Sequence, residues 1–405
     1  MKRRAAAPRK KRLRATVDAL ATLDDRASLD GRAGLAKALA TWYPRVARDL
    51  PWRTRQTKEA GSRRDPWGAL VSELMLQQTQ VARVLEKFEP FMTRFATPRM
   101  LAEAAEHDVL ALWSGLGYYR RARLLHACAK AIVERHAGRV PESVDALRAL
   151  PGLGRYTAGA IASIVFGAAT PIVDGNVARV LLRVSARRGV TAADAMEWAW
   201  DEADELVNAA AAAGVDVGVM NEAMMELGAT VCTPRLPKCD ACPIATACQA
   251  REKGVQDNIP EPKRAAARRA ITADVVVIRR GDRVLVRRRA ARGMWAGMWE
   301  APTRERAGTP HGTEHASKTL IAGLGLGDSG LDPSRCVLTS EHPQTEFLHK
   351  TTHRDVYFRV WAAQHERARS VPTPRDESWR WVRLEELEGL GLSNPQAGIL
   401  RAALG

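Results

Sequence analysis

The spacing of hydrophobic residues changes along the chain, from a helical period in the first two thirds to strand-like alternation in the last third. Three segments show the helical period most clearly: residues 69–84, 124–132 and 194–206. This pattern predicts a helix-rich block over residues 31–250. From Ala270 the sequence reads ADVVVIRR, a Gly281-Asp282 turn and RVLVRRR, which predicts a β-hairpin. We therefore expect a multidomain protein, all-α at first and α+β in residues 270–405.

Two polar segments border these domains. Residues 251–269 include NIPEPKRAAARR, whose two prolines and basic charges oppose a packed element, so they are expected to form a linker. Residues 1–30 are expected to be a disordered basic arm, because residues 2–14 carry eight positive charges before the first acid, Asp18. The arm lacks the apolar stretch of a secretory signal. It would add sequence-independent affinity for DNA, and a targeting role is the alternative.

A long uncharged segment follows a glycine-rich turn in LPGLGRYTAGAIASIVFGAATPIVDGN, residues 150–176. Gly152 and Gly154 allow a tight turn and leave backbone N–H groups open to an anion such as a phosphate. Residues 156–166 are expected to form a buried helix whose N-terminal dipole adds to that site. An ordinary glycine turn before a core helix is the alternative. The weakly apolar composition, and Asp174 at the end of the segment, argue against a membrane span.

Composition narrows the class of partner. The chain has 405 residues, 46% of them hydrophobic, which is enough for two or three domains with their own cores. Its net charge of +16 and its pI near 10.0 point to a polyanion, and nucleic acid is the usual polyanionic partner of a soluble chain. We expect a soluble, intracellular protein without a membrane partner.

Four of the six cysteines are clustered in a loop over residues 232–248. They are spaced C-x6-C-x2-C-x5-C, at Cys232, Cys239, Cys242 and Cys248. Four thiolates so close together would repel one another unless a metal centre neutralised them. Tetrahedral zinc and a four-iron four-sulfur cluster both satisfy this chemistry, and the spacing does not decide between them. Cys128 and Cys336 are interpreted as ordinary thiols.

Several segments together resemble one family of DNA-repair enzymes. LPGLGRYTAGA followed by VDGN resembles the helix-hairpin-helix and catalytic aspartate of base-excision DNA glycosylases. Three more resemble signature segments of the MutY adenine DNA glycosylases: DPWGALVSELMLQQTQV (65–81), WSGLGYYRRAR (113–123) and MNEAMMELGATVCT (220–233). GMWAGMWEAP (293–302) resembles part of the MutT-like, or Nudix, domain that ends MutY proteins. The resemblance is dense over residues 35–250 and looser beyond.

The resemblance implies a fold and a cofactor. The fold is an all-α helix-hairpin-helix glycosylase core of two lobes with the active site between them, followed by an α+β Nudix domain. In this family the cysteine spacing holds a four-iron four-sulfur cluster, so the cluster is favoured over zinc for this chain. Its expected role is structural, because it would fix a loop in which Arg235 and Lys238 face the DNA backbone.

The implied reaction is hydrolysis of the N-glycosidic bond of adenine, for which two carboxyl groups have opposite tasks. Glu73 is the expected general acid toward adenine N7, since its neighbours Leu74, Met75 and Leu76 are apolar and favour the protonated form. Asp174 is expected to stabilise the oxocarbenium ion of the sugar. Asn176 would orient the attacking water or the carboxylates. An ordinary helix N-cap also explains the Asp-Gly-Asn run, and both roles are compatible.

Tyr156 decides the expected reaction subtype. Related glycosylases that also cut the DNA backbone have a lysine at this position of the hairpin motif, because a Schiff base requires an amine. A phenol cannot form one. We therefore expect base removal without strand scission, with the Tyr156 hydroxyl near Asp174 or the sugar.

The resemblance also assigns contacts to DNA. Gln78 and Tyr118 occupy the positions of the wedge that fills the gap left by a flipped base. A set of residues near the N-terminus would line the adenine pocket: Arg48, Trp52 and Arg53. Trp52 is equally explained as a core residue between the lobes, and Tyr118 as a plain core aromatic.

The Nudix domain of this family recognises 8-oxoguanine through a short loop that usually reads Phe-Ser-His. Here Thr351-Thr352-His353 precedes the strand DVYFRVW and is the preferred alignment, with Phe347-Leu348-His349 as the competing one. Thr352 and His353 are the expected contacts, and polar loop residues without this role are the alternative. The candidate helix at 314–324 offers only Glu314, so the domain is expected to bind without holding Mg²⁺ or hydrolysing a diphosphate.

The sequence thus predicts a monofunctional adenine DNA glycosylase of base-excision repair. Its expected partner is double-stranded DNA with adenine opposite 8-oxoguanine or guanine, and it is expected to act as a monomer in the cytoplasm at the nucleoid. A catalytically inactive, lesion-binding iron-sulfur module is the alternative. A Nudix pyrophosphatase is opposed by the missing carboxylate helix.

Overall fold

The computed structural model describes residues 29–54, 64–189, 191–261, 267–310, 317–365, 374–383 and 385–404. Almost all of the predicted basic arm, and the candidate Nudix ligand Glu314, lie outside these residues. Contacts divide the chain into two compact units. The first unit contains Met1–Pro66, Glu142–Ala149 and Leu153–Lys263; the second contains Trp67–Pro141, Leu150–Gly152 and Arg264–Gly405.

The first unit is helical throughout its described residues. Its α-helices are α2 (Leu29–Trp42), α3 (Pro51–Thr54), α9 (Val144–Arg148), α10 (Arg155–Ala160), α11 (Gly175–Val184), α12 (Ala192–Ala212), α13 (Val217–Thr230) and α14 (Gln249–Glu252). A π-helical turn, Ile161–Val165, extends α10. Short 3-10 turns lie at Tyr43–Arg45, Cys239–Ala241, Ala245–Ala247 and Gln256–Asn258.

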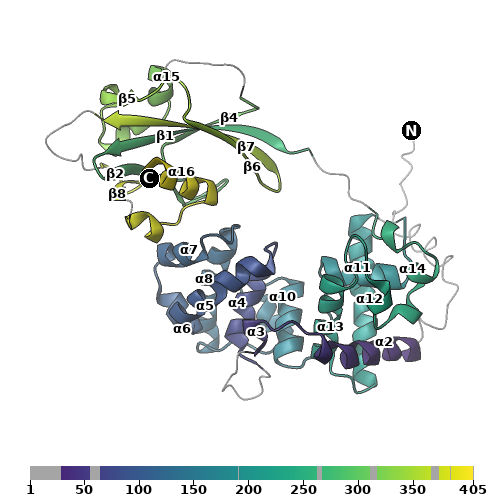
Figure 1. The fold of residues 1–405 in the computed structure, drawn as a ribbon. Helices are drawn as coiled ribbons and strands as arrows, with labels where there is room; N and C mark the ends of the chain where they lie inside the picture. Colours follow the sequence, from purple (N-terminus) through teal and green to yellow (C-terminus); the bar gives the residue numbers. More distant parts are fainter. Residues whose placement is uncertain are drawn as a thin grey trace, which may run out of the picture. The chain divides into compact units, whose positions relative to one another are not determined.

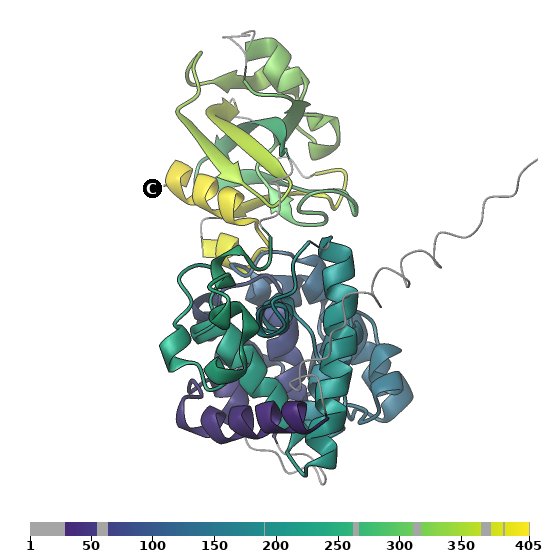
Figure 2. The ribbon, with the colours of Figure 1, turned by 90° about the vertical axis from the view of Figure 1, so that its right-hand side faces the viewer.

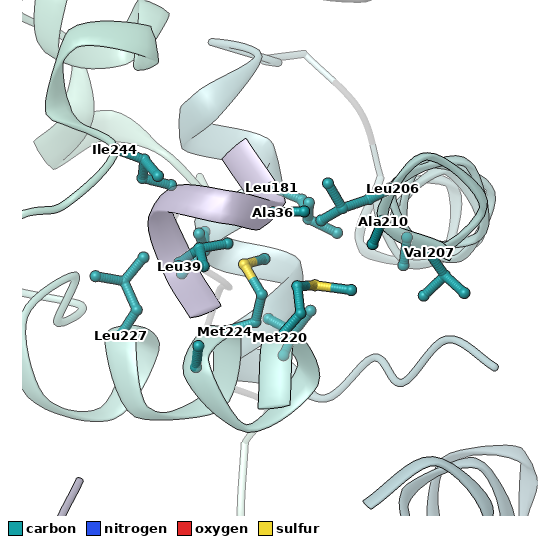
Figure 3. Close-up of a cluster of buried hydrophobic side chains, with 14 of the residues drawn as sticks. Ala36, Leu39, Leu181, Leu206, Val207, Ala210, Met220, Met224, Leu227 and Ile244 are labelled. Atoms are coloured by element: carbon teal, nitrogen blue, oxygen red, sulfur yellow. The ribbon is translucent and has the colours of Figure 1, made fainter. Parts of the chain in front are cut away.

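A hydrophobic core joins α2, α11, α12 and α13. Figure 3 labels side chains of this core from α2, α11, α12 and α13, together with Ile244 of the cysteine loop. The labelled residues on α12, Leu206, Val207 and Ala210, recur at helical spacing and are buried. Side chains cap the starts of these helices: Thr191 accepts a hydrogen bond from Asp194 N, and Asp216 accepts one from Val219 N. The predicted helix in residues 194–206 is therefore confirmed.

The α-helices of the second unit include the predicted segments 69–84 and 124–132, with one correction to the first. They are α4 (Pro66–Leu76), α5 (Val81–Arg94), α6 (Pro98–Glu103), α7 (Glu106–Trp113), α8 (Arg120–His136), α15 (Ser317–Ala322) and α16 (Asn394–Leu404). The continuous helical pattern over residues 69–84 is interrupted, because α4 ends at Leu76 and Gln78 has a φ of +53°. The sequence there, LQQTQ, contains neither glycine nor proline, so the break is not a local preference.

An eight-stranded mixed sheet completes the second unit. Its strands are β1 (Arg269–Arg280), β2 (Arg283–Arg288), β3 (Trp299–Glu300), β4 (Thr303–Ala307), β5 (Cys336–Leu338), β6 (Thr345–Lys350), β7 (Arg354–His365) and β8 (Trp379–Arg383). The two long strands β1 and β7 pair in parallel at the centre, and the other pairs are antiparallel. β1 and β2 form the predicted hairpin around Gly281, with Arg280 opposite Arg283.

Helices cover both faces of this sheet. Val275 and Val277 of β1 pack with Leu400 of α16, whereas Val276 and Ile278 pack with Ile321 of α15. Both views show α15 and α16 on opposite sides of the strands (Figure 1, Figure 2). Burial on both faces explains why β1 reads as a continuous apolar run at its centre.

The N-terminal end of α8 contacts the sheet-bearing part of the second unit through three hydrogen bonds. The Tyr118 and Thr352 hydroxyl oxygens are 2.5 Å apart, Tyr119 Oη donates to Leu392 O at 2.9 Å, and Arg123 Nη2 donates to Ala296 O at 2.7 Å. Among the described residues, no helix is long and apolar enough to cross a membrane.

Candidate active site and DNA-contacting residues

Asp174 caps the N-terminus of α11. Its Oδ1 accepts hydrogen bonds from Asn176 N at 2.9 Å and Val177 N at 2.7 Å, and its Oδ2 accepts one from Asn176 Nδ2 at 3.0 Å. The predicted N-cap is confirmed. The start of α11 and three donors fix this half-buried carboxylate in one orientation.

Arg179 links Asn176 to the cysteine loop. Its Nη2 donates to Asn176 Oδ1 at 3.0 Å and to Gly228 O at 2.7 Å, while its Nε donates to Cys232 O at 2.9 Å. A Cβ on Gly228 would lie 2.7 Å from Asn176 Cβ, so only glycine permits this close approach of α13 to α11. Burial lowers the pKa of Arg179, although Cys232 and Asp174 oppose that effect.

The four loop cysteines line one cavity, together with Arg183, Lys238 and Arg251 among others. Arg183 Nη1 donates to Cys232 Sγ at 3.3 Å. Burial, and then the other thiols of the loop, raise the pKa of Cys239, and burial raises that of Cys242 to about 11. Within the described residues, no three His, Cys, Asp or Glu side chains are arranged around a single metal ion. Four thiols around one cavity with cationic neighbours fit a larger, sulfur-ligated cluster.

Tyr156 lies in the first turn of α10 and is half-buried. Its hydroxyl donates to Met225 Sδ at 3.2 Å, and its ring packs against Ala160, Ile164 and Ile172. The expected buried helix after the glycine turn is present, with its last part in the π-helical turn Ile161–Val165. Asn221 Nδ2 supports this segment by donating to Ser163 Oγ and Thr170 O, both at 3.0 Å.

Glu73 lies near the C-terminal end of α4. Glu73 is half-buried, and the two residues that follow it, Leu74 and Met75, are fully buried. Ser72 beside it is also buried and donates to Ala69 O. The role of Glu73 as a general acid stays a prediction.

Two arginines predicted to line an adenine pocket are held by a buried glutamate. Arg48 Nε donates to Glu226 Oε1 at 2.6 Å, and Arg53 Nη2 donates to Glu226 Oε2 at 2.8 Å. Burial would raise the pKa of Glu226, but the Arg48 and Arg53 hydrogen bonds outweigh it and the pKa is lowered. Trp52, between them in sequence, is 6% exposed.

A second glutamate extends this network. Glu222 pairs with Arg64 through two hydrogen bonds of 3.0 and 2.8 Å, and it lies 3.6 Å from Arg53 Nε. Burial and Glu222 raise the pKa of Tyr43, whose ring lies 5.6 Å from the Arg53 guanidinium. Sequence reasoning did not identify Glu222, Glu226 or Arg64. The available signal was two acids four residues apart in the otherwise uncharged MNEAMMELGAT.

Both predicted wedge residues have a left-handed backbone. Gln78 has a φ of +53° and Tyr118 a φ of +46°, conformations that non-glycine residues rarely adopt. Both are exposed, Tyr118 by 47%. Such backbone strain persists only where the surrounding structure imposes it, and it is common at functional sites.

Tyr118 and the predicted 8-oxoguanine loop border the same cavity. Its volume is about 770 Å³, and three segments line it: residues 116–120 with Arg123, residues 291–296, and residues 349–354. Thr352 and His353 are exposed there, and His349 lines it too. Phe347 instead stacks on Phe358 at 5.0 Å, against the core of the sheet.

The two glycines of the hairpin motif differ in conformation. Gly152 has a φ of +82°, and a Cβ there would lie 2.8 Å from Leu124 Cβ. Gly154 has an extended backbone and precedes α10, and a Cβ there would meet nothing within 4 Å. Only Gly152 is required by the turn itself.

Family models match two separate parts of the chain. Residues 71–203 match the HhH-GPD superfamily of base excision DNA repair proteins, and residues 274–402 match the NUDIX domain. The helical fold with its helix-hairpin-helix, followed by the Nudix sheet, therefore has the class of fold that the sequence predicted.

Curated relatives define the family more closely. A human adenine DNA glycosylase is 46% identical over 224 residues, which cover 55% of this chain and 40% of that protein. One from Mycobacterium tuberculosis is 43% identical over 229 residues, which cover 56% of this chain and 71% of that protein. One from Schizosaccharomyces pombe is 29% identical over 423 residues, covering 91% and 89%. The chain belongs to the MutY family of adenine DNA glycosylases. It spans about two fifths of the length of its mammalian relatives.

Proposed function

We propose that this protein removes adenine from double-stranded DNA where adenine lies opposite 8-oxoguanine or guanine, and that it does so without cutting the strand. The proposal is supported by membership of the adenine DNA glycosylase family over the helical core. A net charge of +16 favours a polyanionic substrate.

The observation that carries this proposal is the carboxylate of Asp174. Three hydrogen bonds and the N-terminus of α11 hold it in a single orientation. Departure of adenine leaves positive charge on the sugar, and a preorganised carboxylate stabilises such charge without rearrangement. Asn176 holds one oxygen of Asp174 and is itself held by Arg179.

The other roles follow from the chemistry of the side chains. Glu73, half-buried beside Leu74 and Met75, would donate a proton to adenine N7 as the bond breaks. Tyr156 stands at the position where strand-cutting relatives have a lysine, and its phenol cannot form a Schiff base with the sugar. Arg48, Trp52 and Arg53 would border the adenine pocket.

We propose that Cys232, Cys239, Cys242 and Cys248 hold one four-iron four-sulfur cluster. When bound, the cluster supplies four metal-thiolate anchors that fix the loop. Arg235 and Lys238 are exposed in this loop, and their charges would then face the DNA backbone.

The sheet domain would recognise 8-oxoguanine without hydrolysing nucleotides. Thr352 and His353 are exposed at the cavity that Tyr118 also lines. The helix α15 reads SKTLIA and offers no carboxylate for Mg²⁺. Nearby, Glu300 is 1% exposed and is neutralised by Arg287 and Arg289. One active site of this kind requires only a monomer.

Single-turnover release of adenine tests the proposal. Duplexes with adenine opposite 8-oxoguanine, guanine or thymine are compared, and strand scission is assayed in parallel without alkali. Rapid release opposite 8-oxoguanine without scission is expected for the natural chain. Glu73→Gln should abolish it, whereas the control Glu86→Gln, an exposed helical pair with Arg83, should not.

Three outcomes would contradict the proposal. Tight binding without release would identify an inactive lesion-binding module. Strand scission observed without alkali treatment would mean that the protein cuts the DNA backbone although Tyr156 replaces the lysine. Hydrolysis of nucleoside triphosphates to nucleoside monophosphates and pyrophosphate would indicate a Nudix hydrolase instead.

A further inference from the structure

The two loops that carry the predicted wedge residues lie against each other in the second unit. One loop, residues 77–80, joins α4 to α5; the other, residues 114–119, joins α7 to α8. The Thr79 hydroxyl lies 3.4 Å from Leu116 O and 3.3 Å from Gln77 O, so it contacts both loops. Gln78 in one loop and Tyr118 in the other both have positive φ angles, which non-glycine residues rarely adopt.

A single buried side chain, Arg121, contacts both loops. It lies in the first turn of α8 and is 7% exposed. Its two terminal nitrogens lie within hydrogen-bond distance of six acceptors, the carbonyl oxygens of Leu74, Met75, Gln77, Leu116 and Gly117 and the Thr79 hydroxyl. Two of these carbonyls, those of Gln77 and Gly117, belong to the residues directly before Gln78 and Tyr118.

These contacts explain why α4 stops where it does. The last carbonyls of a helix have no partner within the helix and must find donors elsewhere. Arg121 Nη1 supplies donors to Leu74 O at 2.9 Å and Met75 O at 2.8 Å. The helix can therefore end without leaving these carbonyls unpaired, and Gln78 takes a left-handed conformation.

Aromatic rings complete the setting of Arg121. The guanidinium carbon lies 5.5 Å from the Trp113 ring centre and 5.3 Å from the Tyr118 ring centre. The six acceptors are neutral oxygens, so carbonyl dipoles and rings balance its charge. Burial lowers the pKa of Arg121 to about 10, which leaves it a cation at neutral pH.

We propose that Arg121 is a positioning residue that locks the two loops together, so that Gln78 and Tyr118 enter the DNA stack as one preformed wedge. The part that concerns DNA rests on the proposed function. A planar guanidinium reaches acceptors in both loops at once, whereas a lysine ammonium has three donors at a single point. Arg121→Lys therefore keeps the positive charge but loses the simultaneous contacts to both loops.

The first experiment tests, without DNA or catalysis, whether Arg121 holds the two loops together. Hydrogen exchange of the full-length protein is followed in peptides covering residues 76–80 and 114–119. Arg121→Lys is expected to speed exchange in both loops at least about tenfold, because contacts to both are lost together. Peptides from β1 and β7 should be unchanged. The control Arg135→Lys alters an exposed arginine of the same helix and should change neither loop.

The second experiment measures what the lock does to the reaction. Adenine release is compared on paired duplexes and on duplexes with mismatches on both sides of the adenine, where less stacking must be broken. Arg121→Lys is expected to slow release about tenfold or more on the paired DNA, and by under about threefold on the mismatched DNA. Gln78→Ala should produce the same pattern, and the double variant should be no slower than the slower single variant.

The outcomes separate this inference from the proposed function. Faster exchange confined to one loop, or in neither, would overturn the lock even if the enzyme is active. Equal losses on both DNAs, with additive effects of Arg121→Lys and Gln78→Ala, would overturn the wedge role. If the natural chain releases no adenine, the proposed function fails, while hydrogen exchange still decides whether Arg121 locks the loops.

Discussion

The hydroxyl oxygens of Tyr118 and Thr352 lie 2.5 Å apart, although 234 positions separate the two residues in the sequence. One residue was predicted to enter the DNA stack and the other to contact 8-oxoguanine. Their contact in a shared cavity gives the two predictions a common location.

Thr352→Val should weaken the preference for 8-oxoguanine over guanine opposite adenine. The substitution removes a hydroxyl from an exposed position, so we expect about a fivefold to tenfold loss of discrimination, near 1 kcal/mol, with little effect on stability. The ratio of single-turnover rates on the two duplexes measures it. Thr345→Val, an exposed threonine on β6, is the control. An unchanged ratio would remove Thr352 from the recognition site.

Asp174→Asn should keep the fold and abolish base release. An asparagine still caps α11 through its carbonyl oxygen but cannot stabilise a sugar cation, so a loss of about a thousandfold or more is expected. The matched control is Asp216→Asn, since Asp216 caps α13 in the same way. Thermal unfolding should show similar small changes for both variants. Comparable activity in the two variants would exclude a catalytic role for Asp174.

The hairpin glycines should respond differently to alanine. Gly152→Ala forces a positive φ on a residue with a Cβ and a 2.8 Å contact with Leu124, so a loss of about 1–3 kcal/mol in unfolding free energy is expected. Gly154→Ala should leave stability unchanged. Denaturant unfolding measures both. If the backbone N–H of Gly154 approaches a phosphate closely, Gly154→Ala will lower the affinity for DNA without lowering the free energy of unfolding.

Stability should fall at acid pH because of Glu226. Its folded pKa is below the ordinary value of 4.5, so its contribution is present above that pH and is lost as pH falls through the lower folded value. Glu226→Gln leaves Arg48 without this charge partner and Arg53 with Glu222 alone, at 3.6 Å, and it should cost about 1–3 kcal/mol at pH 7. It should also flatten the dependence of unfolding free energy on pH below 4.5. Asp201→Asn, exposed on α12, should preserve the natural profile.

Cys239→Ser should remove the metal centre and its visible absorbance. Loss of one of four ligands is expected to lower both iron content and the melting temperature, because metal binding contributes to folding. Cys336→Ala, in the sheet domain, should retain full iron and sulfide. Metal analysis that finds zinc in the natural chain, with no sulfide, would contradict the proposed cluster.

Many secondary-structure elements and several features of the candidate site were predictable from the sequence, because they depend on interactions between residues close together in the chain. The continuous apolar run from Val275 to Ile278 encodes a strand covered on both faces, and Gly281 with Asp282 sets the hairpin. The cap at Asp174 is formed by residues two and three positions later. The cysteine spacing likewise placed four thiols around one cavity.

Other features depended on partners distant in sequence, which local patterns do not encode. The helical period continues through residues 77–80, yet α4 ends there because Arg121, over forty positions later, binds its terminal carbonyls. Arg48 and Arg53 were predicted to line an adenine pocket, but their pairing with the buried Glu226, more than 170 positions away, was not predicted. The sequence by itself determined the elements, the caps and the chemistry available. Tertiary structure alone decided where α4 breaks, which charges are buried and which side chains meet, because these depend on the free energy of long-range packing.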